Sequence, residues 1–419
     1  MTLLRASLTT GVATLVRMAA GLILNKIFAL YIGPAGVGQV AQLSSLAGIA
    51  AGVATGGVTT GVTRYVAEQG EARRAAPFIS TGFAIVCVAA CIASLCLVAF
   101  SSRLAKEILG SASYAWVIWI LAAANLLTAF NALAVAILNG RKRLAAIAAL
   151  GIAGSLLSLT VGAGLTVRQG FTGALVAACL APALPAVALG LYLAVRRRDD
   201  SLFPAAKPDA RCLVLLARYS VMTLTAAIAG PSSVLLVRDH LAAQLSWEAA
   251  GHWQGVWKIS EVYLTFITSS LAVYFLPRLA ELKQGAELRR ELGHGLLTAI
   301  PVVAFAALLI YLLRDWVTVT LYSDAFLPMS VLFPFQLVGD VLKIAGWLFA
   351  YLMLARAMII AYVVTEILFA GSFFALVVVF VAKYGLIGVT YAHAVNYLAY
   401  LIVVWYLTRP LLRSGPAAR

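Results

Sequence analysis

Charged residues are scarce in this sequence of 419 residues. Asp, Glu, Lys and Arg make up 11% of it, whereas hydrophobic residues make up 63%. A soluble domain has about 25% charged residues, and a soluble chain with so few could not cover its apolar surface. Apolar segments recur along the whole chain, and about 20 apolar residues suffice to cross a bilayer as a helix. The composition predicts an all-α polytopic membrane protein and excludes a β-barrel, whose strands alternate in short segments.

Acidic residues are the scarcer charge, with 16 Asp and Glu against 31 Lys and Arg. The net charge of +15 does not indicate nucleic-acid binding, because most of the cations lie in loops that flank the apolar segments. In the first half of the chain, the acidic residues lie in loops or in a linker, at Glu68, Glu71, Glu107, Asp199 and Asp200. A carrier of cationic drugs needs an acid inside the membrane, whereas a positively charged core suits an anion such as phosphate.

Motifs for catalysis and for metal binding are missing from the sequence. The five cysteines show no CxxC pair and no zinc-ligand spacing, and Cys87 and Cys91 fit small-residue packing on one face of an apolar helix. There is no Walker A run, no nucleophile elbow and no metal-ligand cluster. The sequence predicts a transporter that hydrolyses no ATP itself, rather than an enzyme, and it predicts neither cofactor nor metal.

Twelve apolar spans account for most of the chain. We place them at residues 7–31, 39–63, 77–100, 113–139, 144–166, 171–195, 213–237, 249–277, 293–313, 328–354, 357–382 and 385–408. The odd-numbered loops hold few cations, namely Arg103, Lys106, Arg168, Arg238, Arg314 and Lys383. Because Lys and Arg gather on the cytoplasmic side, both termini are expected in the cytoplasm. The first span lacks a signal-peptide cleavage site, so we expect it to stay as a membrane helix.

The two halves of the chain resemble each other at a spacing of about 215 residues, near half of the chain length. The repeated runs are short and rich in glycine. They pair Gly170–Gly173 with Gly385–Gly388, and Gly36–Gln39 with Gly251–Gln254. An internal repeat in so apolar a chain is typical of transporters built from two similar lobes.

A polar stretch with Pro204 and Pro208 separates the two halves. We predict an N-lobe with transmembrane helices 1–6 at residues 1–198, a cytoplasmic linker at 199–212 and a C-lobe with helices 7–12 at 213–419. Since each lobe has six spans, both lobes enter the membrane in the same direction, which makes the repeat a parallel one.

Cations inside the first spans are candidates for substrate binding, because an ionised side chain at mid-membrane costs at least ~2.5–3.5 kcal/mol. One polar face of the first helix holds Thr10, Thr14, Arg17, Gly21 and Asn25. We predict that Arg17 and Asn25 line a cavity and contact an anion; the alternative for Arg17 is a structural bond to helix carbonyls. Lys26 either contacts substrate or snorkels to the interface. Arg64 is either a cytoplasmic anchor or a phosphate contact.

Each of two spans in the second half carries an acid and a lysine three residues apart. Lys258 and Glu261 lie in the eighth span, and Asp340 and Lys343 lie in the tenth. Residues at this spacing share one helix face, so each pair can neutralise itself. In a transport role the two lysines would contact an anionic substrate, and the acids would hold them in place or titrate in a coupling step.

Three further polar residues lie in the last two spans. Glu366 has no cation nearby in sequence, so it is either protonated or paired with a basic residue of another helix. His393 and Asn396 share one face of the twelfth span. For these two, hydrogen-bonded core polarity and a proton relay are the alternatives.

Longer runs of residues carry a family resemblance over nearly the whole chain. The most specific are Ser246-Trp247, Trp253-Gln254-Gly255-Val256 and the run Phe335–Lys343; others are Arg5–Leu8, Gly33–Gly36, Gly61–Ala67 and Leu312–Asp315. On these residues the chain resembles the Wzx-type flippases of the multidrug/oligosaccharidyl-lipid/polysaccharide (MOP) exporter superfamily. The likeness is greatest to the lipid III flippases of enterobacterial common antigen synthesis.

The resemblance implies a MATE-like pair of six-helix bundles around a central cationic cavity that alternates its access. It implies a multi-pass protein of the bacterial inner membrane. Its cargo would be an undecaprenyl-pyrophosphate-linked oligosaccharide, a lipid III or O-antigen unit, moved from the cytoplasmic to the periplasmic leaflet. The polymerase and the chain-length regulator of the pathway would be its neighbours. By position, the cavity cations would be Arg17, Lys26, Arg64, Lys258 and Lys343.

Three other functions fit the sequence less well. An ion-coupled multidrug antiporter of the same superfamily would need a membrane-embedded acid in the first lobe. A lipid II flippase often has fourteen spans rather than twelve. A scaffold in a polysaccharide assembly complex would not need charges at mid-membrane.

Overall fold

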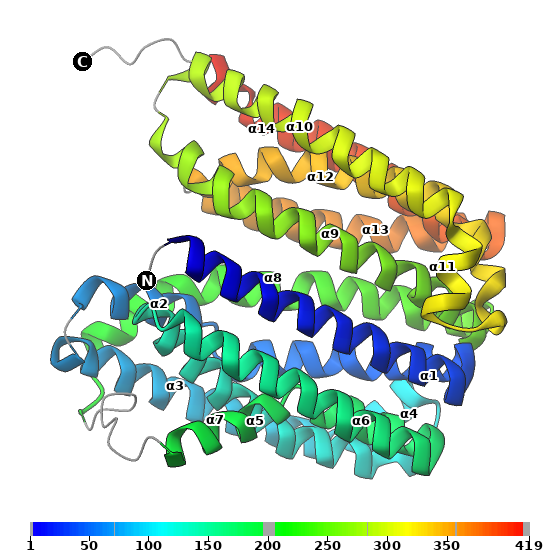
Figure 1. Ribbon diagram of the computed structural model, residues 1–419, viewed down its shortest axis with the longest axis horizontal. Coiled ribbons are helices and arrows are strands. Elements are labelled where there is room, and N and C mark those ends of the chain that lie inside the picture. The colour runs from blue at the N-terminus through cyan, green and yellow to red at the C-terminus, as the bar shows by residue number, and fades with distance from the viewer. Residues whose placement is uncertain (1–2, 71, 196–205, 283, 357, 414–419) are drawn as a thin grey trace. The chain divides into compact units, whose positions relative to one another are not determined.

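The computed structural model describes residues 3–70, 72–195, 206–282, 284–356 and 358–413, and these ranges contain helices and no strand (Figure 1). The chain divides into two compact units, Met1–Leu235 and Leu236–Arg419. The predicted linker at 199–212 lies partly outside the described residues, and the predicted lobe boundaries stay a prediction.

The helices of the first unit follow one another through short turns. They are α1 (Leu3–Ala54), α2 (Thr59–Gln69), α3 (Ala72–Ala99), α4 (Ser101–Leu109), the 3-10 helix η1 (Ala112–Tyr114), α5 (Ala115–Gly140), α6 (Leu144–Leu180), α7 (Leu184–Val195) and the first part of α8 (Ala210–Gln244). The part of α8 up to Leu235 packs with this unit, since Gln42 Nε2 donates a hydrogen bond to the Leu235 carbonyl oxygen at 3.1 Å. The backbone of α8 comes close to the turn before α2, and this requires glycine at position 57, because a Cβ there would lie 2.7 Å from the Ser220 carbonyl oxygen.

The second unit repeats much of this order. It holds the end of α8, then α9 (Trp247–Glu281), α10 (Gly285–Leu312), α11 (Arg314–Leu321), the 3-10 helix η2 (Asp324–Leu332), α12 (Phe333–Ala355), α13 (Ile359–Tyr384), the 3-10 helix η3 (Gly385–Ile387) and α14 (Gly388–Arg413). Ser246 caps α9, because its side chain accepts a hydrogen bond from the Ala249 N–H at 3.1 Å. Glu248 in the first turn adds a negative charge near the positive end of the helix dipole. α12 packs against α9, α10, α13 and α14 at the centre of this unit.

The repeat found in the sequence is visible in the backbone. Gly170, with φ 56° and ψ −129°, bends α6 where the fifth span meets the sixth. Gly385, with φ 63° and ψ −148°, ends α13 where the eleventh span meets the twelfth. Gly33, with φ 64°, bends α1 in the same way. Glycine is required at these bends, because a side chain is rarely found at positive φ.

Two predicted spans are not continuous helices. The second span was expected to reach residue 63, but α1 ends at Ala54, and Gly56 and Gly57 take positive φ before α2 begins. The sixth span, predicted at 171–195, is broken between Leu180 and Leu184. Pro182 lies in that break, where its missing N–H removes a helix hydrogen bond.

Seven helical segments of the described chain are long and apolar enough to cross a membrane. Three of these are folded near a glycine into two arms each: 11–54, 144–180 and 359–412. The arm of α6 after Gly170 is long enough to cross a bilayer only together with α7; counted in this way, and with the more polar α8 and α9, the segments agree with the twelve predicted spans. The outer faces are apolar, with Ile360 80% and Leu297 76% exposed, as expected for side chains in contact with lipid.

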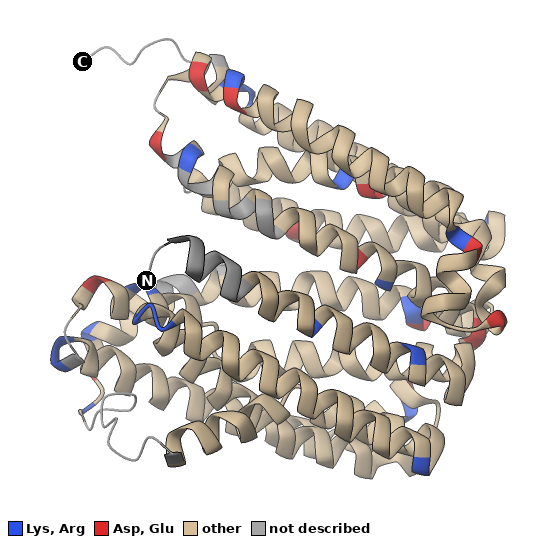
Figure 2. Cartoon of the chain, in the orientation of Figure 1, with Lys and Arg blue, Asp and Glu red and all other residues tan. Residues whose placement is uncertain are grey.

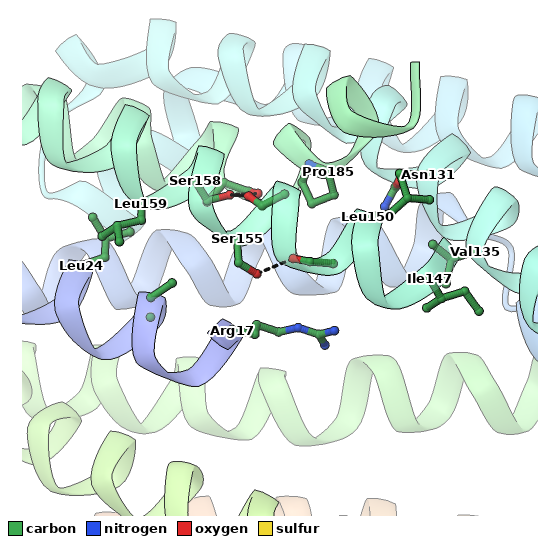
Figure 3. A pocket seen from close by; sticks show the side chains of 15 residues that line it. Arg17, Leu24, Asn131, Val135, Ile147, Leu150, Ser155, Ser158, Leu159 and Pro185 are labelled. Atoms are coloured by element: carbon green, nitrogen blue, oxygen red, sulfur yellow. Dashed lines mark hydrogen bonds between the residues drawn. The ribbon is translucent and has the colours of Figure 1, made fainter. Parts of the chain in front are cut away.

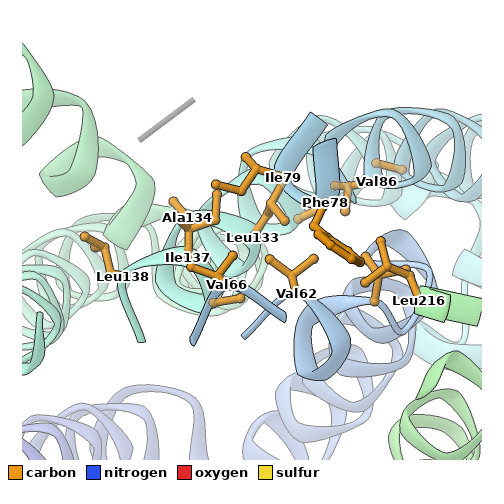
Figure 4. Close-up of a cluster of buried hydrophobic side chains, with 14 of the residues drawn as sticks. Val62, Val66, Phe78, Ile79, Val86, Leu133, Ala134, Ile137, Leu138 and Leu216 are labelled. Carbon is orange, nitrogen blue, oxygen red and sulfur yellow. The ribbon is translucent and has the colours of Figure 1, made fainter. Parts of the chain in front are cut away.

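The core of the first unit lies among α2, α3, α5 and α8 (Figure 4). Val62, Phe78, Leu133 and Leu216 meet there, each buried, with Ile137 beside them. Small residues let these helices approach closely, as is usual in membranes, where packing rather than water exclusion holds helices together. This core fixes α5 and, through it, the helices that form the site of the first unit.

Candidate functional site

Charged residues lie mostly toward the helix ends in each unit, and few lie along the middle of a helix (Figure 2). In the first unit, Arg17 is such a mid-helix charge. It lines a cavity of about 470 Å³ whose walls come from α1, α5, α6 and α7 (Figure 3). Asn131 and Val135 belong to α5, and Ser155 and Ser158 belong to α6. Arg17 and Asn25 were predicted to line a cavity; Arg17 lines this one, and Asn25 is not among its lining residues.

Two glycines of α6 make room for the groups around this cavity. A Cβ at Gly151 would lie 3.2 Å from Arg17 Nη2, and a Cβ at Gly154 would lie 2.8 Å from Pro185. Without side chains at these positions, the guanidinium can lie against the α6 backbone and α7 can approach. The small residues therefore shape the cavity as well as pack the helices.

Hydrogen bonds already satisfy the serine hydroxyls of the cavity. Ser155 Oγ donates to the Gly151 carbonyl at 2.7 Å. Ser158 Oγ is 2.8 Å from the Gly154 carbonyl and 3.2 Å from the Ala181 carbonyl, so its single proton stays on the backbone. Asn131 Oδ1 is buried without a partner in the described structure. Arg17 has no ion pair among the described residues, and the described lining contains no carboxylate.

The other predicted residues of the first unit lie apart from this cavity lining. Lys26 and Asn25 are half-buried on α1, and Asn25 Nδ2 is buried with no partner in the described part of the chain. Arg64 lies on α2 and is exposed. Its Nε is 2.6 Å from Glu68 Oε1, and the carboxylate raises the pKa of Arg64 through a hydrogen bond and charge attraction. The guanidinium also lies 6.0 Å from the ring centre of Tyr65.

In the second unit, Lys258 and Glu261 form the pair that their spacing predicts. Lys258 Nζ lies 2.7 Å from Glu261 Oε2 on one face of α9, and both side chains are partly exposed. A cation that sequence analysis assigned to a loop lies near them. Arg238, expected outside the membrane, lies inside α8 and is only 2% exposed. Glu261 is the acid whose charge acts on it.

Asp340 does not pair directly with Lys343, although the spacing favoured it. Its side chain is fully buried on α12, where Tyr263 of α9 donates to Oδ2 at 2.8 Å. His393 Nε2 of α14 lies 3.0 Å from Oδ1, and Gln336 Nε2 lies 3.5 Å from the same oxygen. His393 is thus part of a buried polar network rather than an isolated core histidine. The sequence pattern does not point to Tyr263, since its partner is 77 residues away.

Lys343 lies instead among aromatic rings. Its Nζ is 5.4 Å from the ring centre of Trp257, 5.2 Å from that of Trp347 and 5.2 Å from that of Tyr397. A cation held over ring faces is stabilised by about 0.5–2 kcal/mol per contact, more when it is desolvated. Trp257 and Tyr397 were missed as functional residues. The tryptophans at positions 253 and 257, one turn apart on α9, were the available signal.

Glu366 and Asn396 complete the polar residues of this unit. Glu366 is half-buried on α13, and Lys343 of α12 is the cation whose charge acts on it. The two make no ion pair within the described residues. Asn396 bonds to Ser372 Oγ at 2.6 Å and to the Phe369 carbonyl at 3.3 Å, so it serves to connect α13 and α14.

Similar proteins support the transporter prediction. The chain matches the family described as "Polysaccharide biosynthesis protein" over residues 3–283. It is 32% identical, over 413 residues and 96% of each chain, to a lipid III flippase of Escherichia coli (strain K12) and to one of Shigella flexneri. An inward-facing multidrug resistance MATE family transporter of the MOP superfamily shares the fold. Its TM-score is 0.76 at 14% identity, over 95% of this chain and 98% of that chain.

These likenesses confirm two predictions from the sequence. The solved structure confirms the all-α MATE-like fold, and the curated relatives confirm the resemblance to flippases rather than to enzymes. The family match extends over more than half of the chain, and the relatives cover nearly all of it. The chain therefore belongs to the polysaccharide biosynthesis protein family, within the MOP transporter fold.

Proposed function

We propose that this protein is a flippase for an undecaprenyl-pyrophosphate-linked oligosaccharide, a lipid III or O-antigen unit. It moves this cargo from the cytoplasmic to the periplasmic leaflet of the bacterial inner membrane by alternating access of its two lobes. The relatives named lipid III flippase support the cargo class. The observation that carries the proposal is that Arg17, a cation within a long apolar segment, lines a cavity and has no acidic partner in the described residues.

Arg17 is suited to bind the diphosphate. A guanidinium keeps its charge in the membrane and offers paired N–H donors that match phosphate oxygens. Removing such a charge from water without a counter-ion is costly. The described residues supply no counter-ion to Arg17, so binding an anionic ligand there is favourable. A cationic drug would gain nothing from this cavity, because its described lining holds no carboxylate.

Lys343 is a second cation suited to an anionic ligand. The three rings around it fix the ammonium without neutralising it, since aromatic faces carry no net charge. The oxygens of Asp340 are already bonded by Tyr263 and His393. Within the described residues, Lys343 therefore has no carboxylate in direct contact with its ammonium.

The remaining predicted residues have accessory roles in this proposal. Arg64 and Lys258 already have carboxylate partners, which weakens what they offer to phosphate. Lys26 and Asn25 extend the polar face of α1 on which Arg17 lies. Glu261, Asp340 and Glu366 hold the lysines in place or take part in coupling. We place both termini in the cytoplasm, from the loop charges, and the polymerase and chain-length regulator of the pathway as neighbours.

Transport by the reconstituted protein tests the proposal. Proteoliposomes with an undecaprenyl-pyrophosphate-linked oligosaccharide should show translocation in the wild type and a loss of at least tenfold in Arg17→Ala combined with Lys343→Ala. Arg103→Ala is the matched control, because Arg103 is an exposed α4 residue paired with Glu107. It should transport normally. If the double variant kept full activity, or if the protein exported a cationic dye and not the lipid, the proposal would be wrong.

A further inference from the structure

The cavity beside Arg17 is mainly apolar. Its walls include Leu24, Val135, Leu150 and Leu159, and its polar side chains are Arg17, Asn131, Ser155 and Ser158. Its volume of about 470 Å³ falls within the ~300–1,000 Å³ of typical ligand sites. A cavity of this size inside one lobe needs an occupant whose chemistry matches an apolar wall with one cation.

The cavity does not suit a sugar. A sugar presents several hydroxyl groups, and each one buried without a partner lowers affinity. Ser155 and Ser158 already direct their protons to helix carbonyls, at 2.7 Å and 2.8 Å. The two serine oxygens can still accept a hydrogen bond but have no proton left to donate, so the lining offers few partners for the many hydroxyls of a sugar. The oligosaccharide of the cargo must therefore lie elsewhere.

The break in the sixth span creates this cavity. Ala181 and Pro185, which flank the start of α7, line it, and Gly154 allows Pro185 to approach. In the second unit the corresponding span, α14, runs unbroken from Gly388 to Arg413. The break is a departure from the repeat, as expected of a feature that serves one function in one lobe.

We propose that this cavity receives the first isoprene units of the polyprenyl diphosphate, with Arg17 on the diphosphate. This inference rests on the proposed function, because it assumes a prenyl-linked cargo. An isoprenyl diphosphate has one anionic end followed directly by an apolar, methyl-branched chain, which matches one guanidinium beside leucine and valine walls (Figure 3). The cavity thus selects the lipid carrier, whatever sugar it bears.

Binding of two small probes to the purified full-length protein tests this. Inorganic pyrophosphate carries the anionic end alone, and neryl diphosphate adds two isoprene units. Each buried CH₂ raises affinity about fourfold, so neryl diphosphate should bind at least tenfold tighter than pyrophosphate. Leu159→Trp fills the cavity and should abolish this difference while leaving pyrophosphate affinity unchanged. Leu156→Trp, on the exposed side of α6, is the matched control and should keep it.

The outcomes separate this inference from the proposed function. Arg17→Ala should weaken both probes by at least tenfold. If pyrophosphate binding depended on Arg17 but neryl diphosphate bound no tighter, or if Leu159→Trp kept the difference, the inference would be overturned and the flippase proposal would stand. Equal loss in both tryptophan variants would mean that detergent, not the cavity, takes the prenyl chain, which also overturns it. If neither probe needed Arg17, the proposed function itself would fail.

Discussion

Asp340 illustrates how a buried acid is held in this membrane protein. Both of its oxygens have partners, Tyr263 on Oδ2 and His393 on Oδ1. These partners come from α9 and α14, so one side chain connects three helices. In a low-dielectric interior a buried carboxylate is costly unless its oxygens are hydrogen-bonded, so these two partners stabilise Asp340.

Removing this carboxylate should destabilise the protein strongly. In Asp340→Ala the Tyr263 hydroxyl and the His393 ring lose a buried partner, and each loss costs about 1–3 kcal/mol. We therefore expect a decrease of roughly 2–5 kcal/mol in the free energy of unfolding, read as a lower thermal midpoint in detergent. Asp340→Asn should lose less, because an amide oxygen still accepts from Tyr263.

An exposed aspartate of the same unit provides the control. Asp315 is 63% exposed, and its carboxylate accepts from Ser330 at 2.5 Å. Asp315→Ala should cost at most about 1 kcal/mol, as surface pairs do. Equal midpoints for the two alanine variants would show that the buried network contributes nothing to stability.

The contacts of single residues were predictable only where the partners lie on one helix. The pair of Lys258 and Glu261 followed from a spacing of three residues, and the structure contains it. The partners of Asp340 and Lys343 did not follow, because they are brought together by helix packing. A competing neighbour with better geometry, the Tyr263 hydroxyl, takes the carboxylate that spacing assigned to the lysine.

Glycine bends mark the boundaries of the repeated elements. Gly170 and Gly385 are 215 positions apart in the sequence and both adopt positive φ with strongly negative ψ. This region of backbone space is nearly exclusive to glycine. The bend therefore depends on the residue type and not on neighbouring side chains, since no atom lies within 4 Å of where a Cβ would be.

Substitution at the bend should be harmful even though there is space for a methyl group. Gly170→Ala should lower the free energy of unfolding by about 1–3 kcal/mol, from backbone strain alone. Gly164→Ala on the same helix is the control: it also has open space, but its backbone is helical, so it should be neutral or stabilise by up to about 1 kcal/mol. Thermal unfolding of both variants in detergent checks this. A stable Gly170→Ala protein would contradict the requirement for glycine.

Elements were predictable in number but not in continuity. Hydropathy located the apolar segments, because each must be about 20 residues long to cross the bilayer. It could not detect that Gly56 and Gly57 end α1 early or that the sixth span breaks near Pro182. A window of hydropathy averages over such residues, whereas the backbone responds to each one. The cavity beside Arg17 depends on the break near Pro182, so it could not be predicted from the positions of the spans.

At the scale of the whole molecule, a common backbone plan carries different chemistry in its two units. The first has a cation beside an apolar cavity and no carboxylate in the described lining. The second combines Lys343, which lies among aromatic rings, with Asp340 and Glu261, which already have partners. The repeat accounts for the paired lobes of the transporter fold, and the charge difference between the units indicates an anionic cargo.

An anionic cargo makes transport sensitive to the membrane potential. An inside-negative potential drives an anion outward with about 2.3 kcal/mol per charge per 100 mV, if the charge crosses the whole field. That corresponds to roughly a fifty-fold change in the equilibrium distribution per charge. We therefore expect proteoliposomes with an imposed inside-negative potassium diffusion potential to translocate the lipid-linked oligosaccharide outward faster than proteoliposomes without one.

The matched condition is a proton gradient at zero potential, which should have little effect if the potential alone drives the anion. The reverse result, a dependence on the proton gradient and none on the potential, would contradict the prediction. It would mean that the charge of the cargo is compensated during transport. The groups able to compensate it are Glu261, Asp340 and Glu366, the acids beside the cations of the second unit. Glu261→Gln and Glu366→Gln would then abolish the response to protons, whereas under potential-driven transport they should leave the response to potential intact.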